Sequence, residues 1–286
     1  MISPRQALKT LGRRASKGLG QHFLIHQATA EKIARALDAK PGDAVVEIGA
    51  GLGALTEPLS QTGAHVIAVE IDPELTSFLR KQLQNLGSSE LLEIECVDVL
   101  RLDFSALSHR FRSKLKIIGN LPYNISSQVL FKLMEEVHCI KEAVLMLQNE
   151  VAARVLAEPG GRDYGILSVM ATYHSERKRL MRLRPHQFHP PPKVDSTVIG
   201  LSFRACPLTP QVASAWLLRV AKEAFAHRRK TLRNSLLAGN LPNLTPKALD
   251  AILEQTGIEP RRRPESLSLE EFLRLAKGLE RVRGKQ

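Results

Sequence analysis

The feature that most constrains the fold is a short apolar run that leads directly into a glycine-rich turn. Residues 44–48, Ala-Val-Val-Glu-Ile, are predicted to form a buried strand, and Gly49-Ala50-Gly51-Leu52-Gly53 follows without a break. Glycines let the backbone approach a ligand closely and leave N–H groups free at the start of the next helix. A strand, such a turn and a helix together form the first unit of a sheet built with helical crossovers.

Further apolar runs repeat this alternation of strands and helical segments. Strands are predicted at 65–69, 92–97, 115–118 and 143–147, and helices at 54–61, 73–85 and 126–137. This order is typical of an α/β, Rossmann-like fold with a mostly parallel sheet and helices on both faces. Ligands bind at the carboxyl ends of the strands in such a sheet.

After Phe203 the pattern changes to helical segments, which predict a small all-helical C-terminal domain. We place the boundary near residue 205, so that residues 1–204 form the α/β domain and 205–286 the helical one. Three helices are expected, and their start and stop signals are Thr209-Pro210, Thr245-Pro246 with Gly257, and a capping box of Ser268 with Glu271.

The charge of the chain points to a polyanionic partner. The formal net charge is +12 and the isoelectric point is about 9.9, which favours nucleic acid over the alternative of a merely basic soluble protein. Three dispersed cysteines, Cys96, Cys139 and Cys206, suggest neither a disulfide framework nor a metal site. A reducing, cytoplasmic location fits best, with no membrane association because no apolar run approaches ~20 residues. Nothing in the sequence demands a dimer, so a monomer is expected.

The first thirty residues are basic and contain no acidic residue. Such a segment is either an organellar transit peptide or a basic arm that touches RNA. We favour the arm, because the motif at residues 20–24 follows it immediately. Its basic residues are Arg5, Lys9, Arg13, Arg14 and Lys17.

Polar residues stand at the ends of the second, third and fourth predicted strands. Glu70 could accept hydrogen bonds from both hydroxyls of a ribose, and Asp98 could accept from an adenine amino group. Each could equally be a solvated acid at a strand end. The fourth strand leads into Asn120-Leu121-Pro122-Tyr123, and parallel topology brings all three strand ends, with the glycine turn, to one crevice.

The turn Asn120-Leu121-Pro122-Tyr123 is suited to making the amino group of a nucleobase nucleophilic. The amide oxygen of Asn120 and the carbonyl of Leu121 could accept its two hydrogens and favour a pyramidal nitrogen. Pro122 stiffens the turn, and Tyr123 offers a face for stacking. By itself Asn-x-Pro is also an ordinary turn after a strand.

The combination fits S-adenosylmethionine as the cofactor. Gly49 and Gly51 would lie beside its amino acid moiety, with Glu70 on the ribose, Asp98 on the adenine and Asn120 near the methyl group. A nicotinamide oxidoreductase is disfavoured, because the spacing GxGxG differs from the dinucleotide fingerprint GxGxxG.

Five motifs together resemble those of the KsgA-type ribosomal RNA adenine dimethyltransferases, in order over residues 17 to about 275. Ala50 departs from the proline that this family usually carries there. The motifs are Gly20-Gln21-His22-Phe23-Leu24, residues 47–56, Asn120-Leu121-Pro122-Tyr123, residues 188–196 (Phe-His-Pro-Pro-Pro-Lys-Val-Asp-Ser) and residues 228–234 (Arg-Arg-Lys-Thr-Leu-Arg-Asn).

The resemblance implies a class I methyltransferase that transfers two methyl groups to N6 of each of two adjacent adenosines. The target would be a hairpin loop near the 3′ end of small-subunit (16S) ribosomal RNA, in the assembling small ribosomal subunit. The family's S-adenosylmethionine contacts, carried onto matching positions, are His22, Leu24, Gly49, Glu70, Asp98 and Asn120. By the same resemblance, Phe188 would pack against the target base beside Tyr123.

The basic segment near residue 230 is predicted to be a helix that binds RNA. On a helical wheel Phe225, Leu232 and Leu236 share one core-facing stripe. Lys230 and Arg233 then face solvent and phosphate together with Arg228, whereas Arg229 borders the core.

Two rival functions remain at this point. An Erm-like enzyme acting on large-subunit RNA would share the catalytic motifs, although the basic C-terminal segment favours the small subunit. A ribosome-assembly or transcription factor could keep the fold and have lost catalysis, and Asn120, Tyr123, Glu70 and Asp98 argue against that loss.

Overall fold

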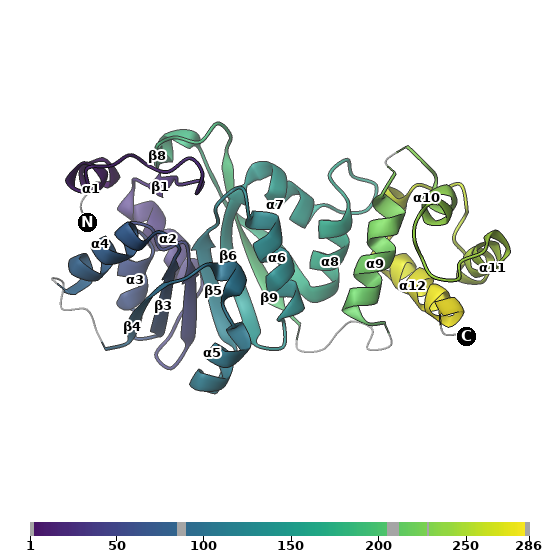
Figure 1. The fold of residues 1–286 in the computed structure, drawn as a ribbon, viewed down its shortest axis with the longest axis horizontal. Helices are drawn as coiled ribbons and strands as arrows, with labels where there is room; N and C mark the ends of the chain where they lie inside the picture. Colours follow the sequence, from purple (N-terminus) through teal and green to yellow (C-terminus); the bar gives the residue numbers. More distant parts are fainter. Residues whose placement is uncertain (1–2, 85–89, 205–211, 228, 284–286) are drawn as a thin grey trace. The chain divides into compact units, whose positions relative to one another are not determined.

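A computed structural model of the 286-residue chain describes residues 3–84, 90–204, 212–227 and 229–283 (Figure 1). It divides into two compact units, one of residues 1–152 with 177–205 and the other of 153–176 with 206–286. We expected residues 153–176 in the first domain. They group with the C-terminal helices instead, because α8 (Ile166–His174) packs against α9 (Ser214–Phe225) and α12 (Leu269–Arg283) of that unit.

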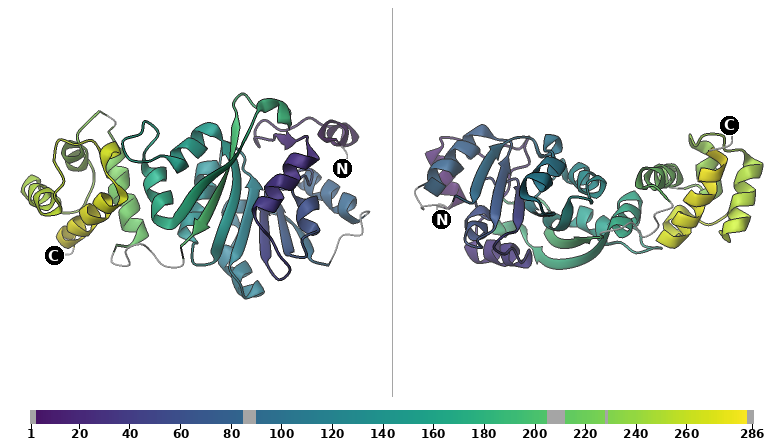
Figure 2. Two further views of the ribbon diagram at one scale, coloured as in Figure 1. Left: turned by 180° about the vertical axis from the view of Figure 1, so that it is seen from behind. Right: turned by 90° about the horizontal axis from the view of Figure 1, so that it is seen from below.

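In the first unit, the described residues form one sheet of seven strands in the order β4-β3-β2-β5-β6-β9-β7 (Figures 1 and 2). The first five of these strands are parallel, and β9 runs antiparallel to β6. The predicted α/β fold is therefore confirmed, although the last two strands of the order were not predicted. In sheet order the bounds are Leu92–Cys96, His65–Glu70, Ala44–Ile48, Leu115–Asn120, Ile140–Gln148, Ser196–Phe203 and Ser175–Leu183.

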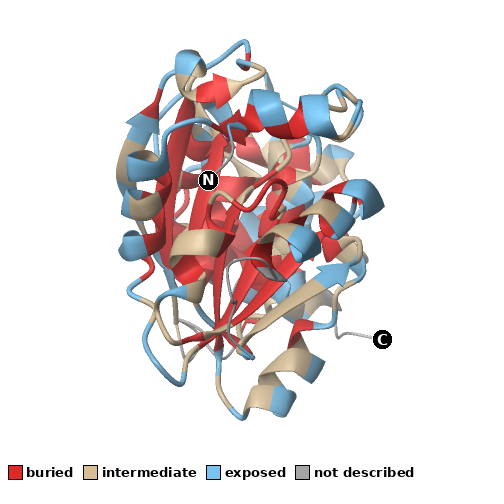
Figure 3. Ribbon diagram, turned by 90° about the vertical axis from the view of Figure 1, so that its left-hand side faces the viewer, coloured by how far each residue is buried: buried red, intermediate tan, exposed pale blue. Residues whose placement is uncertain are grey.

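Helices cover both faces of the sheet (Figure 2), and the central strands are buried (Figure 3). A separate two-stranded antiparallel sheet joins β1 (Phe23–Leu24) to β8 (Phe188–His189). None of the helices in the described ranges combines the length and apolar character that crossing a membrane requires. The helices are α1 (Pro4–Thr10), α2 (Gln27–Ala36), α3 (Thr56–Ser60), α4 (Pro73–Gln84), α5 (Phe104–Phe111), α6 (Ser126–Glu135) and α7 (Asn149–Leu156), with 3-10 turns η1 (Val99–Arg101) and η2 (Pro185–Gln187).

A lysine side chain is buried in the sheet, at the start of β5. The ammonium of Lys116 is buried and lies 3.0 Å from Asp43 Oδ2 and 3.2 Å from Glu142 Oε1. It also donates to the carbonyl oxygens of Leu37 and Asp38. A buried ammonium is tolerated only when it is paired and hydrogen-bonded in this way. Lys116 therefore links β5 to β6 and to the segment that leads into β2.

The second unit is helical in its described residues, as predicted, but the basic segment near residue 230 is not one continuous helix. Residues 226, 227 and 229–231 are not helical, so the described residues form two helices here instead of one. Thr231 begins the second of them by accepting a hydrogen bond from the N–H of Asn234. The bounds are α9 (Ser214–Phe225), α10 (Leu232–Ala238), α11 (Pro246–Thr256) and α12 (Leu269–Arg283), with η3 (Pro264–Ser266).

The other predicted signals of this unit have mixed outcomes. Thr245 caps α11 and Gly257 ends it with φ +68°. The capping box is present, because Glu271 accepts from the N–H of Ser268 and donates its own N–H to the Ser268 hydroxyl. The start signal Thr209-Pro210 lies outside the described residues.

Candidate active site

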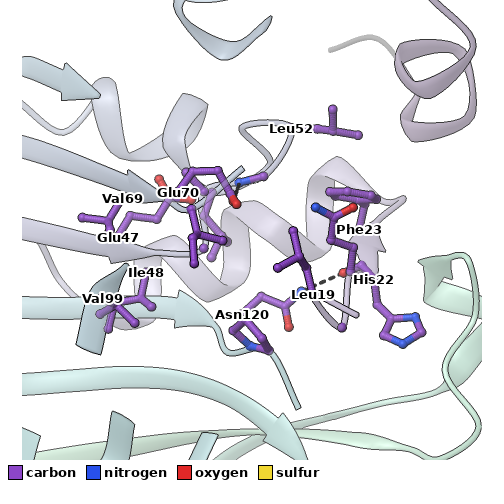
Figure 4. A pocket seen from close by; sticks show the side chains of 18 of the residues that line it. Leu19, His22, Phe23, Glu47, Ile48, Leu52, Val69, Glu70, Val99 and Asn120 are labelled. Atoms are coloured by element: carbon purple, nitrogen blue, oxygen red, sulfur yellow. Dashed lines mark hydrogen bonds between the residues drawn. The ribbon is translucent and has the colours of Figure 1, made fainter. Parts of the chain in front are cut away.

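A pocket opens at the carboxyl ends of β2, β3 and β5 (Figure 4). Its free space of about 960 Å³, which includes the open mouth, is within the range of ~300–1,000 Å³ usual for small-molecule sites. All of the predicted cofactor contacts line it. Those residues are His22, Leu24, Gly49, Gly51, Glu70, Asp98 and Asn120.

The glycine turn after β2 has a left-handed backbone that needs glycine. Gly49 has φ +73° and Gly51 has φ +56°, values that residues with a Cβ rarely adopt. A Cβ on Gly51 would also lie 3.1 Å from the ring of Phe23. The turn therefore brings bare backbone to the pocket.

Glu70 is held in place by main-chain donors. Its carboxylate accepts from the N–H of Gly51 at 2.9 Å and from the N–H of Asp72 at 3.0 Å. Burial nevertheless raises the pKa of Glu70, because desolvation disfavours the charged form. Both bonds fix the direction of the carboxylate, so the geometry of this acceptor is set before any ligand arrives.

Two further carboxyl groups reach the same pocket. Burial raises the pKa of Glu47 to about 7, even though the Thr56 hydroxyl donates to it at 2.6 Å. One oxygen of Asp98 accepts from the N–H of Leu100, which leaves the other for a ligand. No lysine or arginine is among the described residues that line the pocket.

The side chain of Asn120, at the end of β5, is oriented by the main chain of His22. Asn120 Nδ2 donates to the His22 carbonyl oxygen at 2.8 Å, the dashed line in Figure 4. Because Nδ2 is used in this way, Oδ1 is the amide atom left to accept a hydrogen bond from a ligand.

Tyr123 is fixed at its hydroxyl and on one face of its ring. The hydroxyl lies 2.8 Å from the oxygen of the buried Ser196 side chain. The ring of His22 stacks on it, with centroids 5.2 Å apart, and His22 Nδ1 donates to the Pro190 carbonyl at 2.7 Å. The ring of Tyr123 is therefore fixed in position by two segments far apart in the sequence.

The N-terminal arm forms part of the pocket wall. Pro4 and residues 19–24 line the pocket. The guanidinium of Arg13 donates to both oxygens of Asp72, at 2.9 and 2.7 Å, and Gln21 donates to the same carboxylate. Arg13 was expected to touch RNA with the rest of the arm, and its charge is used within the protein instead.

A model of the ribosomal RNA adenine dimethylases matches residues 12–281 of the sequence. The chain belongs to this family. It is therefore an enzyme that dimethylates adenine in ribosomal RNA, with S-adenosylmethionine as the methyl donor.

Individual dimethylases and related methyltransferases agree with this membership. The Ribosomal RNA small subunit methyltransferase A of Nitrosococcus oceani is 42% identical over 94% of this chain and 98% of its own. That of Desulforapulum autotrophicum is 44% identical over 100% and 99%. Among solved structures, a dimethyladenosine transferase from Plasmodium falciparum has a TM-score of 0.76 at 27% identity, over 89% of this chain and 96% of its own. The 23S rRNA methyltransferase ErmE has 0.66 at 27%, over 90% and 99%.

The pocket of this dimethylase fits the methyl donor on its own chemistry. S-adenosylmethionine carries a sulfonium and an ammonium, and the pocket presents the carboxyl groups of Glu47, Glu70 and Asp98 without a basic side chain among its described residues. A dinucleotide would instead bring a pyrophosphate that these groups repel. The residues predicted from the sequence to hold the donor all line this pocket, and their contact with the donor stays a prediction.

Phe188 is a correction to the predicted site. Its ring is 2% exposed and belongs to the apolar core with Leu24, Ile33 and Leu183. The cause is the pairing of β8 with β1, which sets Leu24 opposite Phe188. Phe188 is thus a core packing residue in this structure, whereas the resemblance predicted that it contacts the target base.

The basic segment near residue 230 also differs from its prediction. Arg233 forms a bidentate ion pair with Asp250, so its charge is already compensated. Arg229 was expected to border the core and is exposed, as is Lys230. The exposure of Arg229 follows from the break in the helix, which makes a single helical wheel inapplicable. Arg228 lies outside the described residues.

Sequence reasoning missed four residues that shape the site. Glu47 and Ser196 were present in quoted motifs without an assigned role. Ile71 and Val99 line the pocket next to Glu70 and Asp98, and Ile71 is 47% exposed. An apolar residue directly after each strand-end acid was the signal that could have found Ile71 and Val99.

Proposed function

We propose that the protein dimethylates N6 of two adjacent adenosines in the 3′-terminal hairpin loop of small-subunit ribosomal RNA. It acts on the assembling small subunit in the cytoplasm, as a monomer. Its first domain binds S-adenosylmethionine and its C-terminal helices grip RNA. The observation that carries the proposal is the Asn120 amide, which is oriented by the His22 carbonyl at 2.8 Å beside the acidic pocket.

In this proposal the face of Tyr123 opposite His22 receives the target adenine. Base stacking on an aromatic side chain contributes about 1–3 kcal/mol. Ser196 and His22 hold the ring in place, so little conformational entropy of this side chain is lost when the base binds. An adenine in an unpaired loop also avoids most of the cost of extraction from a duplex.

The amino group is then prepared by acceptors at the end of β5. Asn120 Oδ1 accepts one N6 hydrogen and the Leu121 carbonyl accepts the other, which directs the nitrogen lone pair toward the methyl donor. Pro122 stiffens the turn that carries both acceptors. S-adenosylmethionine supplies an already activated methyl group, so alignment is the main contribution of the protein.

Deprotonation and the second transfer need no further group. The methylated nitrogen is strongly acidic and loses its proton to water. For the second transfer the monomethylated adenine turns or rebinds, and the Asn120 amide accepts the single hydrogen that remains. One turn thus serves both steps.

Exposed basic residues of the second unit support the proposed grip on RNA. The N–H of Leu232 donates to the Arg262 carbonyl at 2.8 Å, which brings two basic segments together. Arg229 and Lys230 are exposed on one segment, and Arg261 and Arg263 on the other. Clustered, weakly paired cations of this kind suit phosphate contacts.

Two sources of RNA distinguish this proposal from an Erm-like activity. The protein is incubated with labelled S-adenosylmethionine and with small or large ribosomal subunits that lack the modification. We expect label in the 3′-terminal hairpin of the small subunit, mapped as two dimethylated adenosines. Label confined to the large subunit, or the absence of label from that hairpin, would overturn the proposal.

A further inference from the structure

The last strand of the sheet, β7, carries an unusual density of basic side chains. Four of its nine residues, Ser175–Leu183, are basic and one is acidic, and Arg184 follows directly after it. The strand ends the order of the sheet, so its outer edge pairs with no other strand of the described residues. Main-chain donors and basic side chains are therefore presented along the same edge. The basic residues are Arg177, Lys178, Arg179, Arg182 and Arg184.

Two of these side chains form no ion pair within the described residues. Arg182 pairs with Asp195 at 2.8 Å. Lys178 and Arg179 are exposed, and within the described ranges no carboxylate forms an ion pair with either of them. Two cations on opposite faces of an edge strand therefore remain available to an external anion.

Lys178 is also held in a defined direction by its neighbour in β9. Its stem lies over Gly200, where a Cβ would be only 3.2 Å from Lys178 Cε. A glycine inside a strand weakens it, and here the missing side chain makes room for the lysine stem. The stem is thus packed on the sheet while the ammonium reaches solvent.

The strand connects directly to the active site. After β7 the chain passes through η2 into β8, which pairs with β1 on the pocket wall. Leu183, at the end of β7, packs in the same core cluster as Leu24 and Phe188. An RNA strand whose adenine enters the pocket can therefore continue along the basic edge.

Edge strands also carry lysine and arginine simply to prevent pairing with another sheet. That role requires charge but no oriented stem and no link to the active site. We propose that the edge of β7, through Lys178 and Arg179, binds the phosphate backbone of the substrate RNA outside the catalytic pocket. This inference rests on the proposed function for the identity of the polyanion.

The test compares the full-length double variant Lys178→Gln, Arg179→Gln with a control that removes two exposed lysines elsewhere, Lys32→Gln, Lys81→Gln. Binding to unmodified small subunits and to a 3′-terminal RNA fragment is measured from 50 to 200 mM salt. Each lost phosphate contact lowers the magnitude of the slope of log K against log[salt] by about 0.7–0.9. We expect a decrease of about 1.5 and roughly tenfold weaker binding in low salt.

The control should keep the wild-type slope, and both variants should keep the wild-type melting temperature and S-adenosylmethionine affinity. An unchanged slope in the β7 variant would overturn the proposal. If the β7 variant self-associates but binds RNA as the wild type does, these charges serve to prevent the edge strand from pairing with another sheet. Loss of binding to anionic vesicles alone would assign them to a lipid surface. If the wild-type protein binds these RNAs without methylating them, the proposed target fails while the slope comparison stands.

Discussion

The cofactor pocket and the basic surfaces of this protein are built in opposite ways. Glu47 and Glu70 are 1% and 7% exposed, and each carboxyl accepts hydrogen bonds from fixed protein donors. Lys178 and Lys230 are exposed, and the structure packs only the stem of Lys178, on Gly200, while its ammonium is left in solvent. Recognition of one small ligand requires fixed direction, whereas attraction of a polyanion requires mainly charge.

This contrast predicts different responses to substitution. A change in the pocket should act on one step and by a large factor, because the lost group has no substitute. A change on a basic surface should act by a small factor and should depend on salt, because many charges share the task. The following experiments test that difference, beginning with the largest effect.

The largest effect is expected for Asn120→Ala. Removal of a preorganised hydrogen-bonding group at a reacting centre typically lowers kcat by about 10²–10³. RNA binding should be almost unchanged. The rate of methyl transfer at saturating RNA and cofactor measures kcat, and filter binding measures the affinity for RNA. Asn124→Ala, an exposed asparagine four residues on, is the matched control, and near-normal turnover in Asn120→Ala would show that the amide does not position the amine.

The next effect concerns stability and pH. The pKa of Glu47 is raised to about 7 by burial, from about 4.5 in the unfolded chain. Between these values the unfolded state loses a proton that the folded state keeps, so stability falls as pH rises and levels off above about 7. The loss is up to about 3 kcal/mol.

Glu47→Gln should remove this loss, since an amide does not ionise. We expect the variant to unfold at a higher temperature than the wild type at pH 8 and at nearly the same temperature at pH 5. Thermal unfolding of the variant and the wild type at pH 5 and at pH 8 measures this difference. A variant that is equally destabilised at both pH values would show that the Thr56 bond, not ionisation, dominates.

A smaller effect is expected for Glu70→Gln. The ribose hydroxyls of the bound donor would lose a charged acceptor, and a hydrogen bond to a charged group is worth about 1.5–3 kcal/mol. The Kd for S-adenosylmethionine should therefore rise by about 10- to 100-fold, measured by calorimetry, with RNA affinity unchanged. Glu95→Gln, on an exposed glutamate of β4, is the control. Equal cofactor affinity in both variants would contradict the role of Glu70.

The smallest effect is expected for two nearby cations of the second unit, Lys230 and Arg233, which should differ in their contribution to the salt dependence of RNA binding. Lys230→Ala should lower the magnitude of the salt slope of RNA binding by about 0.7–0.9. Arg233→Ala should leave it nearly unchanged, because Asp250 already occupies that guanidinium. Equal slopes in the two variants would mean that the ion pair opens on RNA.

The same contrast explains what the sequence could predict. The first five strands and their terminal residues followed from apolar runs, because strands buried on both faces read as continuous hydrophobic segments. Parallel topology then brought Gly49, Glu70, Asp98 and Asn120 to one edge without further information. The local pattern was sufficient wherever the chain itself fixed the geometry.

The failures depend on contacts between distant segments. Phe188 is buried because β8 pairs with β1, more than 160 residues earlier in the chain. The N–H of Leu232, near the break in the predicted basic helix, bonds the Arg262 carbonyl, a contact that no helical wheel contains. The partners of Arg13 and Arg233 are likewise 59 and 17 positions away. None of these pairings leaves a periodic signal.

The buried ammonium of Lys116 has a consequence for how this region can vary among homologous genes. It fixes one end of β5 by four bonds, while Asn120 stands four residues later at the other end. Successive residues of a strand alternate between faces, so one inserted or deleted codon between them would turn the amide to the wrong side. Length changes should therefore be absent from this stretch of five residues, even where its apolar residues exchange freely.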